Sequence, residues 1–307
     1  MTELLNKKFL DLLKKNDLSK DAFQEQISYL HKIKREKITL RLSKQESKDV
    51  GSVIYNINYG LIQYFNSNFY KFVDLFEAMI LSINSKNYSS AITLGRSIFE
   101  HFAMFIYKTQ IYIKFLNKKD YLKLAIDLSY WGTPEPLRLM HPNYKRTHIM
   151  DAVRNLDIFY NNKNKSKKYF ETMYHNFSEN VHPASNSINM THVRQAEKAE
   201  KDEKWDKDGL SIDVYFDTET DEAFLTELIW IIGFIPSELV AKIIPLYNNS
   251  ILGEWDKIKF SAYDYFKNNP KKANEILANT IDKKLSDLNR SVNNLEDIDI
   301  KIHKEFK

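Results

Sequence analysis

The chain contains no cysteine among its 307 residues, and it has only seven glycines and seven prolines. The absence of cysteine excludes disulfides, thiolate catalysis and cysteine-ligated zinc, and it fits a protein of a reducing compartment. Glycine and proline are the residues that tight turns require, so their scarcity favours long helices over a sheet built from many short hairpins. The sequence therefore predicts a predominantly helical protein.

Long uninterrupted hydrophobic runs are also missing. The first ten residues carry two lysines but no apolar stretch of signal-peptide length, so we expect no secretion. The most apolar run, Leu228–Leu246, contains Glu238 and Lys242 near its middle, and a membrane span would have to bury both charges. This run is predicted to be a buried core helix. We accordingly expect a cytoplasmic protein that has no membrane partner.

Three familiar constellations are absent from the sequence: a glycine-rich phosphate loop, a G-x-S-x-G elbow and an H-E-x-x-H zinc helix. No cofactor and no metal are therefore predicted. Hydrophobic residues make up 43% of the chain and charged residues 28%, which is the balance of an ordinary globular protein. The chain is thus expected to fold around a core of its own.

Apolar residues return at three- and four-residue steps along most of the chain, which is the period of one helical face. The longest such stretches, 52–83 and 88–117, are joined by a short connection and are predicted to pack antiparallel. The fold class is all-α, an up-and-down helical bundle with a small irregular or β excursion near 184–221. Further helices are expected at 4–13, 19–33, 121–130, 147–160, 168–181, 221–246 and 273–295.

The predicted bundle divides the chain into three parts. Residues 1–50 form a basic helical region, 51–247 the bundle and 248–307 a helical extension. The segment 31–48 has seven Lys or Arg against two Glu, and 138–168 has eight Lys or Arg against two Asp. Two such segments could attract RNA or a nucleotide, although lysine-rich faces are often simply solvated. Both interpretations stay open at this point.

Polar residues inside one strongly apolar helix give the first candidate site. Arg96 and Glu100 are four residues apart, so they lie one turn apart on the same helical face and can pair. His101 is five residues from Arg96, about 140° round the helix axis, and need not face the same pocket. Buried charges require partners, so the pair either stabilises a helix interface or serves a site.

A second candidate cluster lies at 174–183. His175, Ser178 and His182 fall on one helical stripe, and Pro183 places His182 at or near the end of the helix. The negative end of the helix dipole should favour the charged form of that histidine. A capping histidine is the alternative.

Taken together, R-x-x-x-E in one long helix and S-x-x-V-H-P at the end of a later one resemble an uncharacterised bacterial family related to the HEPN superfamily of helical bundles. The resemblance covers roughly 50–247. It implies an up-and-down bundle, often dimeric, from a group that includes metal-independent ribonucleases of toxin and phage-defence systems. Those nucleases carry R-x(4 to 6)-H, which Arg96 to His101 matches in spacing. Where an active late helix would have Arg, this chain has Asn176.

The resemblance implies two functions. In a ribonuclease, His182 would exchange protons with the attacking 2′-hydroxyl and Arg96 would contact the phosphate. Glu100 would orient Arg96, Ser178 would donate a hydrogen bond, and His101 is the alternative base. The other function is non-catalytic. It is either a sensor or antitoxin-like partner, in which the same residues bind a nucleotide or a protein or fix a dimer interface, or a pure interaction scaffold.

Overall fold

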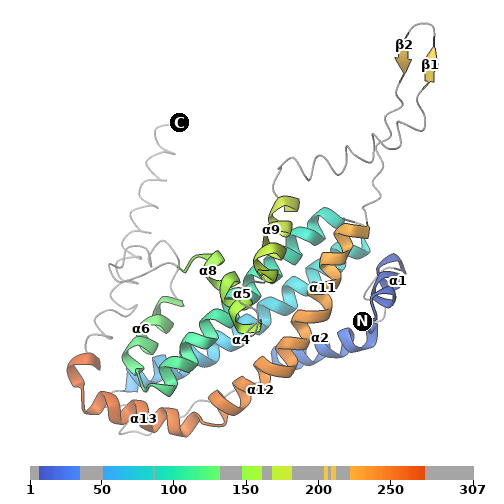
Figure 1. Cartoon of the computed structure of the whole chain (residues 1–307). Helices are drawn as coiled ribbons and strands as arrows, with labels where there is room; N and C mark the ends of the chain where they lie inside the picture. Colours follow the sequence, from blue (N-terminus) through green and yellow to red (C-terminus); the bar gives the residue numbers. More distant parts are fainter. Residues whose placement is uncertain are drawn as a thin grey trace, which may run out of the picture. The chain divides into compact units, whose positions relative to one another are not determined.

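The computed structural model describes residues 7–34, 51–85, 87–131, 147–160, 168–181, 204–206, 209–211 and 222–273. This part of the chain is all-α apart from one short hairpin, as predicted (Figure 1). The predicted terminal helix at 273–295 lies almost entirely outside these residues. The helices are α1 (Lys7–Lys15), α2 (Lys20–Lys34), α4 (Gly51–Asn84), α5 (Tyr88–Asn117), α6 (Tyr121–Trp131), α8 (Ile149–Tyr160), α9 (Tyr169–Val181), α11 (Glu222–Glu238), α12 (Ile244–Leu246) and α13 (Trp255–Lys267).

Short polar side chains set several helix starts. The Ser19 hydroxyl accepts a hydrogen bond from the Ala22 amide at 3.2 Å and so caps α2, the helix predicted at 19–33. The Asn87 side-chain oxygen likewise accepts from the Ser90 amide at 3.3 Å, at the start of α5. Both caps satisfy amides that have no partner within their own helix.

The described residues cluster into two compact units, and each unit is assembled from three separate stretches of chain. Helices α4 and α5 contribute to both units. The predicted division at 50 and 247 stays a prediction. The first unit takes residues 1–36, 68–109 and 147–245; the second takes 37–67, 110–146 and 246–307.

Helices α4 and α5 pair antiparallel in both units, as predicted. In the first unit, Phe69 meets Phe105 at 5.7 Å between ring centroids and Phe72 meets Phe102 at 6.4 Å. In the second unit, Tyr64 lies 4.8 Å from Tyr112. Residue numbers fall along α4 as they rise along α5, which only an antiparallel pair allows.

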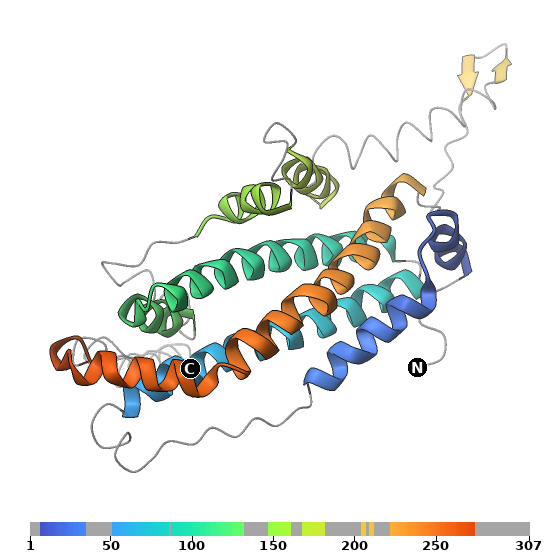
Figure 2. The ribbon, with the colours of Figure 1, turned by 60° about the horizontal axis from the view of Figure 1, so that its bottom comes forward.

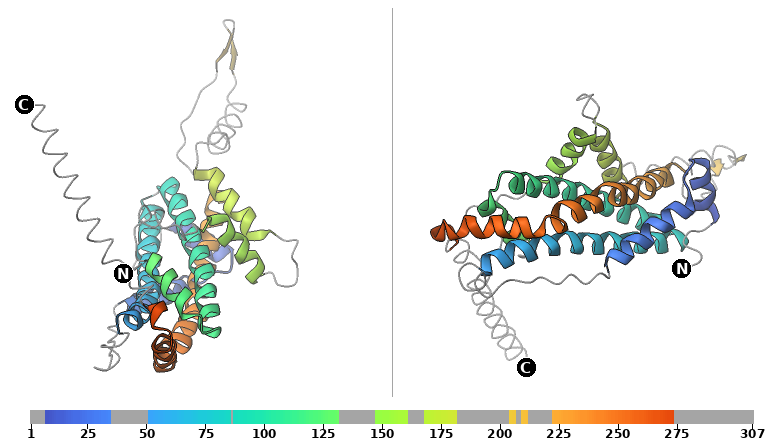
Figure 3. Two further views of the ribbon diagram at one scale, coloured as in Figure 1. Left: turned by 90° about the vertical axis from the view of Figure 1, so that its left-hand side faces the viewer. Right: turned by 90° about the horizontal axis from the view of Figure 1, so that it is seen from below.

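Aromatic side chains form the core of the first unit. Helix α2 packs against α4 through Phe23 and Phe76, whose ring centroids are 6.2 Å apart. Helix α11 packs against α5 through Phe102 and Phe234, 6.1 Å apart. Helices α1 and α2 also contact α11, and α8 packs on α9 (Figure 2). The α8–α9 pair lies beside α5 (Figure 3).

The second unit has a core of its own. Tyr247 stacks on Phe65 with ring centroids 4.8 Å apart, and its hydroxyl lies 3.3 Å from the Asn66 side-chain oxygen. Helix α13 contributes buried Ile258, Ala262 and Phe266. Helix α13 lies within 248–307, which was expected to be a helical extension, although no bounds were predicted for this helix.

Helix α11 continues through Pro236, and the backbone then widens into two π-helical segments, η1 (Leu239–Ile243) and η2 (Tyr247–Leu252). The stretch Leu228–Leu252 is the one candidate within the described residues that is long and apolar enough to cross a membrane, and half of its most apolar window is buried. Core helices pass the same test. Its packing on α2 and α5 agrees with the predicted core helix.

The predicted β excursion appears as a hairpin of two short strands. Strand β1 (Lys204–Asp206) pairs antiparallel with β2 (Gly209–Ser211), and Trp205 lies opposite Leu210. Both strands fall inside the predicted range of 184–221, and the rest of that range lies outside the described residues.

Candidate functional site

The Arg96 guanidinium bridges α5 and α9. Its Nε donates a hydrogen bond to Glu100 Oε1 at 2.9 Å, and Nη2 donates to the Tyr174 hydroxyl oxygen at 3.3 Å. The guanidinium carbon also lies 5.4 Å from the centroid of the Tyr174 ring, within the range of a cation–π contact. The expected pairing of Arg96 with Glu100 is thereby confirmed. Tyr174 is an additional partner that the sequence analysis did not assign.

This cluster is partly shielded from water. The Arg96 side chain is 16% exposed and that of Glu100 is 33% exposed. Burial lowers the pKa of Arg96, but the hydrogen bonds and charge of Glu100 and Tyr174 more than offset it and raise the pKa above its ordinary value. Arg96 therefore stays charged at any physiological pH.

His101 faces α4 rather than α9. Its ring lies 4.5 Å from the Phe72 ring centroid, and Nε2 lies 3.4 Å from the Asn68 carbonyl oxygen. Burial lowers the pKa of His101 to about 3, the charge of Lys71 adds to this, and the Asn68 contact opposes it. His101 is thus neutral at pH 7, and it contacts a different helix from Arg96.

Ser178 and His182 belong to α9 and the residue that follows it. The Ser178 hydroxyl donates to the Tyr174 carbonyl oxygen at 2.9 Å, a bond within its own helix. Helix α9 ends at Val181, so His182 lies outside the described residues. Phe99 contacts Phe170 and Phe177 on α9, and a Cβ at Gly95 would lie 3.6 Å from Phe177. The end of α9 therefore runs towards the start of α5.

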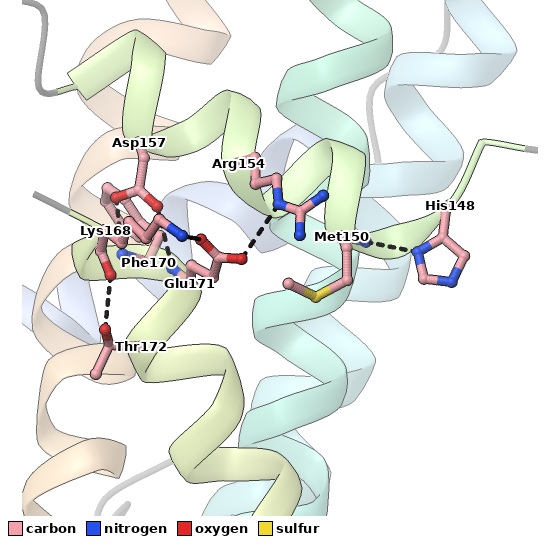
Figure 4. A network of polar contacts seen from close by, with 8 residues as sticks. All are labelled: His148, Met150, Arg154, Asp157, Lys168, Phe170, Glu171 and Thr172. Atoms are coloured by element: carbon pink, nitrogen blue, oxygen red, sulfur yellow. Dashed lines mark hydrogen bonds and ion pairs between the residues drawn. The ribbon is translucent and has the colours of Figure 1, made fainter. Parts of the chain in front are cut away.

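Most of the two basic segments lies outside the described residues, and what is described includes Arg154 and Lys168. Arg154 Nε lies 3.2 Å from Glu171 Oε1, and Lys168 Nζ lies 3.3 Å from Oε2 (Figure 4). Burial raises the pKa of the Glu171 carboxyl, but its bonds to the two cations outweigh this and hold the pKa below its usual range. Two of the predicted basic residues thus share one carboxylate.

Asp157 fixes the start of α9 against α8. Its Oδ1 accepts a hydrogen bond from the Phe170 amide at 2.9 Å, and Oδ2 accepts from the Glu171 amide at 3.1 Å (Figure 4). These are orphan amides of the first helical turn. The position of α9 is thereby set, and these two amides already have an anionic partner.

An open groove of about 840 Å³ lies in the first unit between α9, α11 and the turn that joins α1 to α2. Most of its lining is apolar or aromatic. Among the described residues that line it, Lys168 is the one that carries a charge. The lining residues are Asn16, Leu18, Lys168, Tyr169, Thr172, Met173, Asn176, Ile229, Trp230, Gly233 and Phe234.

Gly233 allows the turn between α1 and α2 to approach α11. A Cβ at this position would lie 2.9 Å from Leu18 Cδ2 and 3.0 Å from Cδ1, closer than carbon atoms normally pack. The turn itself passes through Asp17 in a left-handed conformation, with φ of 55°. Leu18 consequently forms one wall of the groove.

This groove was not predicted from the sequence. The apolar side chains of α11 were expected in the core, and Trp230 and Phe234 do contact the core residues Phe99 and Phe102. Gly233 could have indicated the groove from the sequence. It has no side chain, and it lies on the same helical face as Trp230.

Glu100→Ala is expected to lower the free energy of unfolding by about 1–2 kcal/mol, because it removes one of the partners of a mostly buried donor. The exposure of Glu100 makes this smaller than the 3–5 kcal/mol loss typical of fully buried pairs. Urea unfolding would measure it, with Glu25→Ala on the exposed surface of α2 as the control. Equal losses in the two variants would show that the pair with Arg96 does not stabilise the fold.

Comparisons with known proteins give no match: no family model, no curated protein and no solved structure is similar to this chain. Its function is therefore inferred from the groove and from the side chains around Arg96.

Proposed function

We propose that the chain is a cytoplasmic, water-soluble helical binding module, without catalytic activity, whose ligand lies in the groove between α9 and α11. The groove carries this proposal. Its volume of about 840 Å³ falls in the range of small-molecule sites. Such sites are mostly apolar with a few polar groups, and Asn16, Thr172, Asn176 and Lys168 supply those groups here.

The walls of the groove are held by the core, which supports a preformed site. Trp230 stacks on Phe234 with centroids 4.5 Å apart and an angle of 23° between the ring planes. Trp230 also contacts Phe99, which is fully buried. The opposite wall, α9, is fixed at its start by Asp157. A rigid site loses little entropy when a ligand binds.

The neutral aromatic dye Nile red tests the groove without reference to any natural ligand. Asn176→Trp places a large side chain in the groove, whereas His175→Trp, on the neighbouring exposed position of α9, does not. We expect saturable dye fluorescence with the wild type and with His175→Trp. We expect at least about tenfold weaker binding to Asn176→Trp, since the dye can no longer enter. Equal binding to all three proteins would reject the groove as the site.

A metal-independent ribonuclease is the second candidate, and the Arg96 cluster favours it. A mostly buried guanidinium held by Glu100 and Tyr174 is suited to a phosphate. Helix α9 ends one residue before His182. In this proposal His182 moves the proton of the attacking 2′-hydroxyl, and the basic segments 31–48 and 138–168 hold the RNA.

Cleavage of an unstructured RNA in the presence of EDTA tests this candidate. A catalytic His182 predicts that His182→Asn is folded but inactive, while His175→Asn keeps its activity. Arg96→Ala should reduce cleavage as well, and binding should weaken steeply with salt. No cleavage by the wild type, or full cleavage by a folded His182→Asn protein, removes His182 from the function.

A further inference from the structure

The charge of the groove is concentrated at one side chain. Lys168 is the charged residue among the described lining residues, and no described carboxylate lines the groove. Its Nζ lies 3.3 Å from Glu171 Oε2, and the side chain is 73% exposed. An ammonium group has three N–H donors, so this one ion pair leaves Nζ able to hold a further acceptor.

The Glu171 carboxylate, which pairs with Lys168, also pairs with a second cation, Arg154. Glu171 Oε1 lies 3.2 Å from Arg154 Nε, so two cations share one carboxylate. Asp157 gives both of its oxygens to the amides at the start of α9. An anion at the groove would therefore meet Lys168, because those amides are already occupied.

The rest of the groove favours an aromatic ligand over an aliphatic one. Trp230 and Phe234 form a stacked pair, and the Tyr169 ring lies 6.2 Å from Trp230 at 60°. Tyr169 is 49% exposed, so part of its ring faces water. The Met173 thioether completes this lining. Aromatic rings and sulfur both gain specific contacts with another ring, whereas an alkyl chain gains burial alone.

We propose that the groove binds a planar aromatic anion, with its ring against Trp230 and Phe234 and its negative group at Lys168. This inference rests on the proposed binding function and specifies the ligand class. Thr172 and Asn176, one and two turns along α9 from Lys168, supply neutral hydrogen-bonding groups to the same groove. The carboxylate of such a ligand replaces part of the water around Nζ.

Three probes separate the two parts of the proposal in calorimetric titrations of the full chain. 2-Naphthoate carries the ring and the charge, 2-naphthamide carries the ring alone, and decanoate carries the charge on an alkyl chain. We expect 2-naphthoate to bind most tightly. Lys168→Gln should weaken 2-naphthoate about two- to fivefold, the usual effect of an exposed ion pair, and leave 2-naphthamide unchanged.

Arg154→Gln is the matched control. It removes the same charge and also takes one cation from Glu171, but Arg154 does not line the groove. We expect 2-naphthamide to bind Arg154→Gln as it binds the wild type. We expect 2-naphthoate to lose less affinity than with Lys168→Gln, because Lys168 stays in place although it alone then pairs with Glu171. Equal losses in the two variants would overturn a direct contact with Lys168, and decanoate or 2-naphthamide binding as tightly as 2-naphthoate would overturn the ligand class.

Nile red distinguishes failure of this inference from failure of the groove. If the dye binds and Asn176→Trp blocks it, but 2-naphthoate does not displace it, the binding function stands and the aromatic anion is rejected. If neither compound binds the wild type, both proposals fall. Dye binding to Lys168→Gln also shows that this variant is folded.

Discussion

Phe99→Ala should lower the free energy of unfolding by about 3–5 kcal/mol, the usual cost of emptying a buried aromatic site. Phe99 has no exposed surface, and its ring lies 6.1 Å from both Phe177 and Trp230. The truncation therefore leaves a cavity where α5, α9 and α11 meet. Urea denaturation followed by circular dichroism measures the change.

The control for this variant is Phe159→Ala in the same unit. Phe159 is 44% exposed, so its truncation removes less buried surface and should cost about 1 kcal/mol. If Phe99→Ala proved no more destabilising than Phe159→Ala, the three helices could not meet at Phe99 as described.

The stability of the fold should fall by about 2–3 kcal/mol between pH 7 and pH 4.5 through His101 alone. The folded pKa of His101 is about 3, whereas an unfolded histidine titrates near 6.5. The unfolded state therefore takes up the proton first. Stability is complete above about pH 6.5 and is lost at roughly 1.4 kcal/mol per unit as the pH falls towards 3.

His101→Leu isolates this contribution, because leucine fills the site beside Phe72 and does not titrate. The carboxylates that also titrate near pH 4.5 are common to both proteins and cancel in the comparison. The wild type should lose about 2–3 kcal/mol more than His101→Leu over this interval. Identical losses would mean that the folded structure does not lower the pKa of His101.

The helices were readable from the sequence because their signals are local. Helix α4 repeats buried phenylalanines at three- and four-residue steps, and Ser19 and Asn87 cap the helices that follow them. The bounds of α13 were not predicted, although 248–307 was expected to be helical. Phe260, which is 59% exposed, lies outside the buried stripe of Ile258, Ala262 and Phe266 and obscures its period.

The candidate site was only partly readable. The pairing of Arg96 with Glu100 follows from their spacing on one helix, so it was predicted correctly. Tyr174 and the groove depend on contacts between residues far apart in the chain. No local pattern shows that Leu18 meets Gly233, because that contact joins residues more than two hundred positions apart. The groove therefore required the structure.

The interleaving of the two units has a consequence for synthesis on the ribosome. Helices α1 and α2 are synthesised well before α11, one of their packing partners. The first unit cannot close until α11 has left the exit tunnel, so an apolar residue such as Leu18, which contacts α11 at Gly233, stays uncovered during translation. We therefore expect the nascent chain to need rapid synthesis, or binding by a chaperone, to avoid aggregation.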